Sequence, residues 1–228
     1  MKRVLIGCPV RNRAWILPSY LDSLLNLNYP EELREYAFIV NDCVDDTWQI
    51  LQEFALNCSS PVHLIVKNMG SKTSTIRGGY NLNGLVVLRN ELLNVFLRTK
   101  CSHLFSVDSD ILVKSESLRR LLELGIPIVS GLVRNDHHLG DLGFYNILQE
   151  EHGHLVPIRD FPRDQVISVD CTGAAYLIKR EVIEAGVRYK MHRQGEDAGF
   201  CEEARKFGFT MSCHTGIECE HVMMNNVE

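Results

Sequence analysis

The stretch that decides the fold is His103-Leu104-Phe105-Ser106-Val107-Asp108-Ser109-Asp110. Its first five residues are mostly apolar and are typical of a short buried strand, and two carboxylates follow where that strand ends. Two carboxylates one residue apart suit a hard divalent cation, which takes few protein oxygens and completes its coordination with water and phosphate. A short Asp-x-Asp sequence is also common in solvent-exposed turns, so its meaning depends on the elements around it.

Apolar runs and helical patterns alternate on both sides of this strand. The predicted strands are 4–6, 37–40, 62–66, 103–107 and 126–129, and the predicted helices are 14–27, 45–57, 81–100 and 115–124, with a loop at 71–80. This alternation predicts an α/β fold whose central sheet is mostly parallel and covered by helices on both faces. Ligands bind such sheets at the carboxyl ends of the strands, where we expect Asp42 and Asp108.

The regular alternation stops near residue 130. Glycines, histidines and short apolar runs follow, and they predict short antiparallel strands at 143–147, 154–158 and 166–169. No linker, repeat or low-complexity segment separates the two parts. We therefore expect a single domain over 1–228, with a regular half at 1–130 and a smaller, partly antiparallel half at 131–228.

Composition narrows the classes of function. The chain has 228 residues, a net charge of −5 and 45% hydrophobic residues, which is ordinary for a globular protein and gives no sign of a nucleic-acid partner. No apolar stretch approaches the length of a transmembrane segment, and the run after Met1-Lys2-Arg3 is too short for a signal peptide. The eight cysteines include no Cys-x-x-Cys pair, so we expect reduced thiols and a cytoplasmic location.

Two further polar motifs lie near the C-terminus. Gly195-Glu196-Asp197 precedes an amphipathic segment, and its carboxylates could simply cap a helix or could serve as a general base in a cleft. Glu218-Cys219-Glu220-His221 ends in a histidine that is either a surface residue or a metal ligand. A neutral imidazole would complement the oxygens of Asp108 and Asp110 around Mn²⁺.

Taken in order along nearly the whole chain, these motifs resemble the nucleotide-sugar-dependent glycosyltransferases of the GT-A fold, close to the family 2 type. The matching stretches are Pro9-Val10-Arg11-Asn12-Arg13, Asn41-Asp42-Cys43-Val44-Asp45-Asp46-Thr47, Arg89-Asn90, Asp108-Ser109-Asp110, Cys171-Thr172-Gly173-Ala174-Ala175, Glu196-Asp197 and His221. The segment 131–168 has no counterpart in this resemblance. The first half would therefore bind the nucleotide, and the second would carry the acceptor side and the catalytic residues.

The resemblance implies a role for each matching residue. Nucleotide-sugar binding is implied for Pro9, Val10, Arg11, Asp42, Arg89, Asp108 and Ser109. A Mn²⁺ or Mg²⁺ ion is implied at Asp108, Asp110 and His221, with Asp110 as the principal ligand. Asp42 would accept a hydrogen bond from the base. Asp197 would be the base of an inverting reaction, with Glu196 as its support.

The donor implied by the resemblance is a nucleotide sugar, with a preference for a UDP-sugar. The acceptor would be a glycan, a lipid-linked molecule or a small molecule, and a homo-oligomer is compatible with the pattern. The polar segment from Arg134 to Asp141, with His137 and His138, is expected to form a loop over the cleft, either as a lid or as an ordinary surface loop.

Three alternatives remain open at this stage. A sugar-nucleotide pyrophosphorylase is also α/β and metal-dependent, but it would need a glycine-rich phosphate loop after the first strand, where this chain has two arginines and no glycine. A non-catalytic zinc-binding module would use Cys213, His214, Cys219 and His221, whose spacing is irregular. The third is a catalytically inactive GT-A-like binding protein.

Overall fold

The computed structural model describes residues 2–70, 82–135 and 143–223. Within these ranges the main feature is a nine-stranded sheet with the order β3-β2-β1-β4-β11-β6-β12-β5, in which β9 also pairs with β12. Its strands are β1 (Val4–Val10), β2 (Arg34–Val40), β3 (Val62–Val66), β4 (His103–Val107), β5 (Ile111–Leu112), β6 (Ile128–Val133), β9 (Val166–Val169), β11 (Ala175–Lys179) and β12 (Met211–His221).

The first half of the chain forms the parallel part of the sheet. Strand β1 pairs in parallel with β2 and with β4, and β2 pairs in parallel with β3. The predicted strands 62–66 and 103–107 have the observed bounds, whereas β1 and β2 are longer than predicted. As expected, Asp42 and Asp108 follow the carboxyl ends of β2 and β4. The mostly parallel α/β sheet predicted from the sequence is confirmed.

Strands from the second half complete the same sheet. Strand β11 lies between β4 and β6 and is antiparallel to both, whereas the 11-residue β12 runs parallel to β6. Neither strand was among the strands expected from periodicity. Strand β12 changes its pairing register with β6 between His214 and Glu218, although every second side chain from Met211 to Cys219 remains buried.

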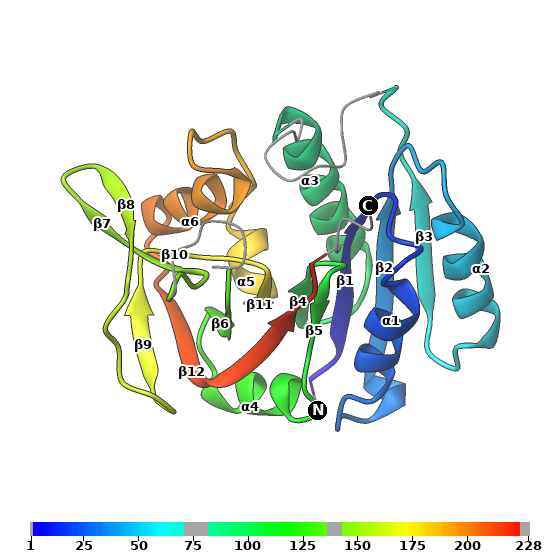
Figure 1. Cartoon of the computed structure of the whole chain (residues 1–228), viewed down its shortest axis with the longest axis horizontal. Helices are drawn as coiled ribbons and strands as arrows, with labels where there is room; N and C mark the ends of the chain where they lie inside the picture. The colour runs from blue at the N-terminus through cyan, green and yellow to red at the C-terminus, as the bar shows by residue number, and fades with distance from the viewer. Residues whose placement is uncertain (1, 71–81, 136–142, 224–228) are drawn as a thin grey trace.

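Helices cover both faces of this sheet (Figure 1). The helices are α1 (Leu17–Leu25), α2 (Thr47–Asn57), α3 (Leu82–Arg98), α4 (Ser117–Leu124), α5 (Arg180–Glu184) and α6 (Glu196–Lys206), and Glu31–Leu33 form a 3₁₀ turn. One hydrophobic core joins the sheet to α1, α2 and α4, and a second core joins its other face to α3, α5 and α6. Strand β1 contributes to both, because Val4 and Ile6 face the first core and Leu5 faces the second.

Local sequence explains where these helices begin and end. A proline in the first turn of α1 suits the position where a backbone N–H has no partner within the helix. Leu17, Tyr20, Leu21 and Leu24 then recur at helical spacing and are buried. Helix α4 ends at Gly125, whose φ of 63° is the left-handed conformation that terminates many helices. None of these helices is both long and apolar enough to cross a membrane, as far as the described residues extend.

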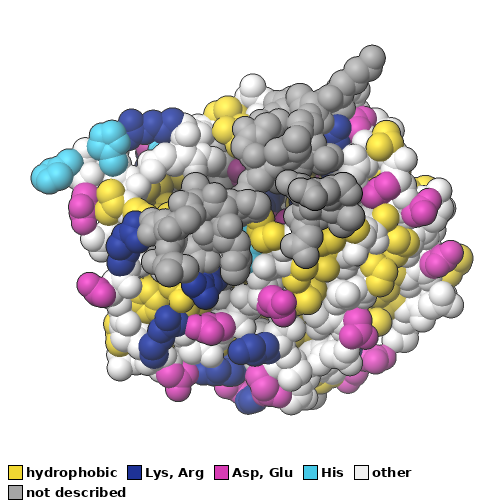
Figure 2. All heavy atoms as spheres, viewed as in Figure 1, with side chains coloured by type: hydrophobic (Ala, Val, Ile, Leu, Met, Phe, Trp, Pro, Cys, Tyr) yellow, Lys and Arg dark blue, Asp and Glu magenta, His cyan; other side chains and the backbone are white. Residues whose placement is uncertain are grey.

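A small antiparallel sheet of β10 (Cys171–Thr172), β7 (Ile147–Glu151) and β8 (His154–Pro157) projects beside α6. The strand predicted at 143–147 was wrong in its bounds: only Tyr145 makes an isolated bridge, with Arg134, and the strand proper starts at Ile147. The tip of the β7–β8 hairpin gathers histidine and basic side chains (Figure 2), and there Arg193 contacts His154 through Nη2 and Nδ1, 2.6 Å apart. Most of the expected lid, and the loop at 71–80, lie outside the described residues.

Candidate active site

Two loops at the carboxyl end of the sheet are joined by hydrogen bonds. Val44 N–H donates to Asn12 Oδ1 at 2.9 Å, Arg13 N–H donates to Thr47 Oγ1 at 2.7 Å, and Ala14 N–H donates to Asp45 Oδ2 at 3.0 Å. These contacts connect the loop after β1 to the loop after β2. They bring the predicted nucleotide-binding residues Pro9, Val10 and Arg11 to the same edge as Asp42, since Val10 is the register partner of Val40.

Asp42 shapes the neighbouring backbone. Its φ is 43°, a left-handed conformation that aspartate tolerates better than most residues. Its carboxylate accepts hydrogen bonds from the N–H groups of Met69 and Gly70 at 3.1 and 3.3 Å, and its own N–H donates to Asn68 Oδ1 at 2.9 Å. Asp42 therefore links the end of β2 to the segment that follows β3, at the edge where a nucleotide base was expected.

Asp108 is held from two sides at the end of β4. Its N–H donates to the carbonyl of Ala174 at 2.8 Å. Its Oδ1 lies 2.7 Å from Nη2 of Arg89, a residue of α3. The intervening Ser109, predicted to contact the donor, is only 5% exposed. The second carboxylate of the motif, Asp110, lies beside Arg13 instead and is partly exposed.

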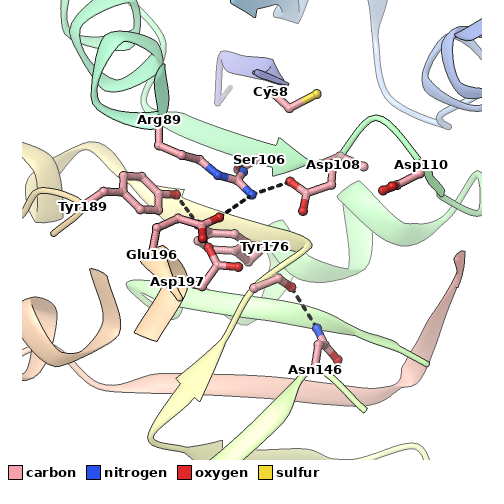
Figure 3. Close-up of polar contacts among 12 residues, drawn as sticks. Cys8, Arg89, Ser106, Asp108, Asp110, Asn146, Tyr176, Tyr189, Glu196 and Asp197 are labelled. Carbon is pink, nitrogen blue, oxygen red and sulfur yellow. Dashed lines mark hydrogen bonds and ion pairs between the residues drawn. The ribbon is translucent and has the colours of Figure 1, made fainter. Parts of the chain in front are cut away.

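The Arg89 guanidinium bridges two groups of acidic residues (Figure 3). It is 3% exposed; besides Asp108, its Nη2 lies 3.4 Å from Oε1 of Glu196, and its Nη1 donates to Ser106 Oγ at 3.2 Å. Burial alone would lower the pKa of Arg89, but the charges of Asp108 and Asp197 outweigh it and raise that pKa well above its usual range. Arg89 is thus a permanent cation beneath the site.

Asp197 occupies the first turn of α6, and Gly195 precedes the helix with a φ of 107°. Its Oδ1 accepts a hydrogen bond from the hydroxyl of Tyr176 at 3.1 Å. Its Oδ2 lies against Gly173 so closely that a Cβ atom there would collide with it. The glycine in the stretch 171–175 is therefore required for the position of this carboxylate.

The acidic residues raise one another's pKa values. Burial, together with the charges of Glu196 and Asp108, outweighs Arg89 and raises the pKa of Asp197 to about 8. Burial and the neighbouring charges of Asp110 and Glu196 raise the pKa of Asp108 to about 6 in the same way. The cause is that one guanidinium cannot neutralise all of these carboxyl groups in a poorly solvated site.

Asp110 and His221 lie side by side because β5 pairs with β12. His221 is the register partner of Ile111, and Val222 N–H donates to the carbonyl of Asp110 at 2.9 Å. His221 Nε2 lies 3.9 Å from Asp110 Oδ2, and the other ring nitrogen is 3.0 Å from Asn135 Oδ1. Arg13 Nη2 approaches the same Asp110 oxygen at 3.3 Å.

The predicted three-ligand metal set does not close in the structure. Asp108 turns towards Arg89, and within 2–70, 82–135 and 143–223 no group of three or more His, Cys, Asp or Glu side chains could hold a metal ion. Asp110 and His221 still offer one oxygen and one nitrogen, which fits a cation that completes its coordination with phosphate and water. The alternative zinc site does not form: Cys213 packs in one core, and Cys219 packs in the core on the opposite face.

Sequence reasoning missed several residues that build this site. Tyr176 and Tyr189 contact the Asp197 region from β11 and from the loop before α6, and no local pattern connects them. Asn146 is buried, and its amide donates to the carbonyls of Gly173 and Gly131 at 2.9 and 3.0 Å. Only Gly173 carried a signal, as part of the stretch 171–175.

Comparison with known proteins agrees with this architecture. The chain superposes on the mannosyltransferase PcManGT from Pyrobaculum calidifontis, solved with GDP-Man and Mn²⁺, with a TM-score of 0.68 at 15% identity, covering 99% of this chain and 58% of that one. It superposes on Staphylococcus aureus TarS in complex with UDP-GlcNAc with a TM-score of 0.65 at 14% identity, covering 99% and 60%. The fold is GT-A.

Sequence relatives of this GT-A chain match only part of its length. Residues 1–73 match the Anp1 family model. A glycosyltransferase 25 family member from Anopheles gambiae is 27% identical over 143 residues, which are 58% of this chain and 24% of the relative. The VAN1 subunit of the Saccharomyces cerevisiae mannan polymerase I complex is 48% identical over 40 residues, 18% of this chain and 8% of the relative. The chain thus spans a quarter or less of the length of these curated relatives.

Proposed function

We propose that this GT-A chain is a metal-dependent glycosyltransferase that moves a sugar from a nucleoside diphosphate to an acceptor hydroxyl with inversion. The observation that carries the proposal is the presence of two chemically different acidic sites, one at Asp197 near Arg89 and one at Asp110, two residues after the Asp108 that Arg89 also contacts. Asp197, with its raised pKa, suits a base, whereas Asp110 with His221 suits a divalent cation. Both sites lie at the carboxyl edge of the sheet, where ligands of such folds bind.

Asp197 is the proposed base. A base works best when its pKa lies near the working pH, and the raised pKa of Asp197 meets that requirement. It would remove the proton of the acceptor hydroxyl as that oxygen attacks the anomeric carbon from the face opposite the leaving group. Glu196 supports it by sharing Arg89, so that the guanidinium stays beside both carboxylates.

Asp110 and His221 are the proposed cation ligands. A Mn²⁺ or Mg²⁺ ion held there would offset the negative charge of the departing nucleoside diphosphate. Arg13, which lies beside Asp110, would contribute a second positive charge on the same side. Asp108 keeps Arg89 in place and would border the donor site at the end of β4.

The proposed donor site is formed by the loops after β1 and β2, with Pro9, Arg11 and Asp42 near the nucleoside. A UDP-sugar is the first donor to test. GDP-mannose is the second, because solved neighbours with the same fold were bound to GDP-Man and to UDP-GlcNAc.

A panel of nucleotide sugars tests this function. Purified protein is incubated with UDP-glucose, UDP-GlcNAc or GDP-mannose, with Mn²⁺ or with EDTA, and release of the nucleoside diphosphate is measured. We expect Mn²⁺-dependent release with at least one donor, and a loss of about 10² to 10⁴-fold in Asp197→Asn with donor affinity retained. Asp22→Asn, an exposed carboxylate on α1, is the matched control.

Two results would contradict the proposal. Turnover of Asp197→Asn at the wild-type rate would place the base elsewhere. Formation of pyrophosphate from a nucleoside triphosphate and a sugar 1-phosphate, without diphosphate release from any nucleotide sugar, would instead indicate a pyrophosphorylase.

A further inference from the structure

Two tyrosine hydroxyls lead to the Asp197 carboxylate. Tyr176 OH donates to Asp197 Oδ1 at 3.1 Å, and the hydroxyls of Tyr176 and Tyr189 are hydrogen-bonded to each other. Figure 3 shows the three groups in a row, with Tyr176 in the middle. Tyr176 comes from β11, Tyr189 from the loop between α5 and α6, and Asp197 from α6, so the chain of hydrogen bonds joins three separate elements.

Packing fixes both tyrosine rings. The Tyr189 ring stacks on Phe200 with centroids 4.6 Å apart, and the Tyr176 ring lies 6.2 Å from the same Phe200. Tyr176 and Phe200 are fully buried, and Tyr189 is 2% exposed. Phe200 follows Asp197 by about one turn of α6, so the residue that holds the rings also fixes the rotation of the helix that carries the carboxylate.

The backbone of Tyr189 is held as firmly as its ring. Asn90 Nδ2 donates to the Tyr189 carbonyl at 2.9 Å, and Tyr189 N–H donates to Asn90 Oδ1 at 3.0 Å. The neighbouring Arg89 places its guanidinium carbon 5.8 Å from the centre of the Tyr189 ring. The Tyr189 hydroxyl is therefore held through both its backbone and its ring.

The charges around the pair make it a donor to the carboxylate. Burial and the nearby Asp197 raise the pKa of Tyr176, and burial also raises the pKa of Tyr189, so both hydroxyls keep their protons. Each hydroxyl has one proton to give. When Asp197 is ionised, Tyr176 donates to Asp197 and Tyr189 donates to Tyr176, an order in which each bond strengthens the next.

The structure assigns Tyr176 and Tyr189 as positioning residues for Asp197. This inference rests on the proposed function only in that Asp197 is taken as the base. The groups that face Asp197 are Glu196 from its own helix, Arg89 from α3, Asp108 after β4 and Tyr176 from β11. Among them Tyr176 is the neutral donor that bonds to Oδ1. This bond fixes the rotation of the carboxylate, with Oδ1 at the Tyr176 hydroxyl and Oδ2 at Gly173.

The pair orients Asp197 rather than removing its proton. A relay would have to end in solvent, whereas this chain of hydroxyls ends at Tyr189, which is buried against Phe200 and held by Asn90. The proton taken by Asp197 therefore has to leave from the open side of the carboxylate. A hydroxyl pair that leads inward can act only on the direction and the ionisation of that group.

The test compares Tyr176→Phe, Tyr189→Phe and the double variant with wild type. Tyr36→Phe is the matched control, because it removes the hydroxyl of another fully buried tyrosine in the core on the opposite face of the sheet. Two readouts are taken: the pH profile of kcat with the active nucleotide sugar, and the titration of the Asp197 carboxyl by ¹³C NMR in aspartate-labelled protein. The Asp197 signal is assigned by its absence in Asp197→Asn.

We expect Tyr176→Phe to lower kcat by about 10- to 100-fold with KM for the donor little changed, as for loss of a hydrogen bond to a charged group. The acidic limb of the pH profile and the Asp197 titration should both move upward, by about one pH unit, because the ionised carboxylate loses a donor. Tyr189→Phe should act in the same direction but less, and the double variant should resemble Tyr176→Phe.

A wild-type carboxyl titration in Tyr176→Phe would overturn the inference, even if kcat fell. If wild-type protein released no nucleotide from any donor, the proposed function would be wrong. The NMR titration would still decide whether the hydroxyl pair governs Asp197, so the two failures are distinguishable.

Discussion

At the scale of single residues, Gly173 sets the position of the Asp197 carboxylate. A side chain at residue 173 would occupy the space of Oδ2. We expect Gly173→Ala to reduce sugar transfer by about 10²-fold or more, because a displacement of a reacting group by about 1 Å costs that much. Affinity for UDP or GDP with Mn²⁺ should be unchanged in calorimetry.

The adjacent residue supplies the control for this prediction. Ala174 has a φ of 66°, which favours glycine, so Ala174→Gly changes the same turn without filling the space beside Asp197. Equal losses in Ala174→Gly and Gly173→Ala would mean that the turn tolerates no change of any kind, and the steric explanation would fail.

Asp197 also makes stability depend on pH in a predictable direction. Its pKa is about 8 in the folded chain, against a usual value near 3.8, so between these pH values the unfolded state binds fewer protons and stability falls as pH rises. Asp197→Asn removes this effect. Because the side chain is partly exposed, solvent screens the charge, and we expect a gain of about 1 kcal/mol, or about 2–4 °C in Tm, at pH 8.

Thermal unfolding of wild type and Asp197→Asn at pH 4 and pH 8 checks this expectation. The two proteins should differ much less in Tm at pH 4, where the carboxyl is protonated in the folded state and only partly ionised in the unfolded chain. A lower Tm for Asp197→Asn at pH 8 would show that the carboxylate is stabilised by Arg89 more than burial destabilises it.

Single residues were predictable from sequence where the motif was local. Two acidic pairs were visible in the sequence beside predicted elements: Glu196 with Asp197, and Asp108 with Asp110. Tyr176 and Tyr189 could not be identified in this way. Neither belongs to a local motif, and their hydroxyls come together only when β11 packs against the loop before α6. The turn of Asp108 towards Arg89 was likewise invisible, because it depends on a helix that contacts the strand only in the folded chain.

At the scale of elements, the pairing of β5 with β12 creates the proposed cation site. That pairing places His221 beside Asp110, although the two residues are far apart in sequence. We expect Asp110→Ala to abolish the Mn²⁺ dependence of nucleotide binding measured by calorimetry. His221→Ala should weaken it by about tenfold, as for loss of one ligand or its support.

The control for the cation site is His214→Ala, a histidine of the same strand that contacts Arg120 at 3.3 Å. It should leave Mn²⁺-dependent nucleotide binding as in wild type. Undiminished affinity of Asp110→Ala for UDP or GDP with Mn²⁺ would remove Asp110 from the set of ligands.

Elements with clean periodicity were predictable, and β12 shows why others were not. Met211, Cys213, Thr215, Ile217 and Cys219 are buried at every second position, as expected of a strand. The register shift between His214 and Glu218, together with a threonine and a glycine at its centre, makes this segment look like a loop in sequence. Pairing with β6 on one side and β9 on the other overrides that local weakness.

At the scale of the whole molecule, the two halves expected from the sequence share one sheet. Strand β11, from the second half, lies between β4 and β6. Without β11 the edge of β4 would have no partner strand. We expect a single cooperative thermal transition for residues 1–228 by calorimetry. A fragment of residues 1–130 should show no cooperative melting, because it cuts β6 short and leaves exposed the edge of β4 that β11 covers.

A cooperative transition in the 1–130 fragment would show that its parallel sheet is an independent folding unit. The full chain would then be expected to melt in two steps, which the same calorimetric scan would record. The overall α/β class was predictable because it follows from alternation alone, whereas the insertion of β11 between two earlier strands is a long-range choice that no short pattern specifies.

The turn at residues 173 and 174 has one more consequence. Gly173 rests against the Asp197 carboxylate, and the carbonyl of the very next residue, Ala174, receives the N–H of Asp108. The proposed base and the acidic end of β4 thus both contact the dipeptide Gly173-Ala174, and this dipeptide sets the distance between them. A sugar being transferred would have to fit within this distance. A longer or shorter turn should therefore alter the sugar specificity even when the chain still folds.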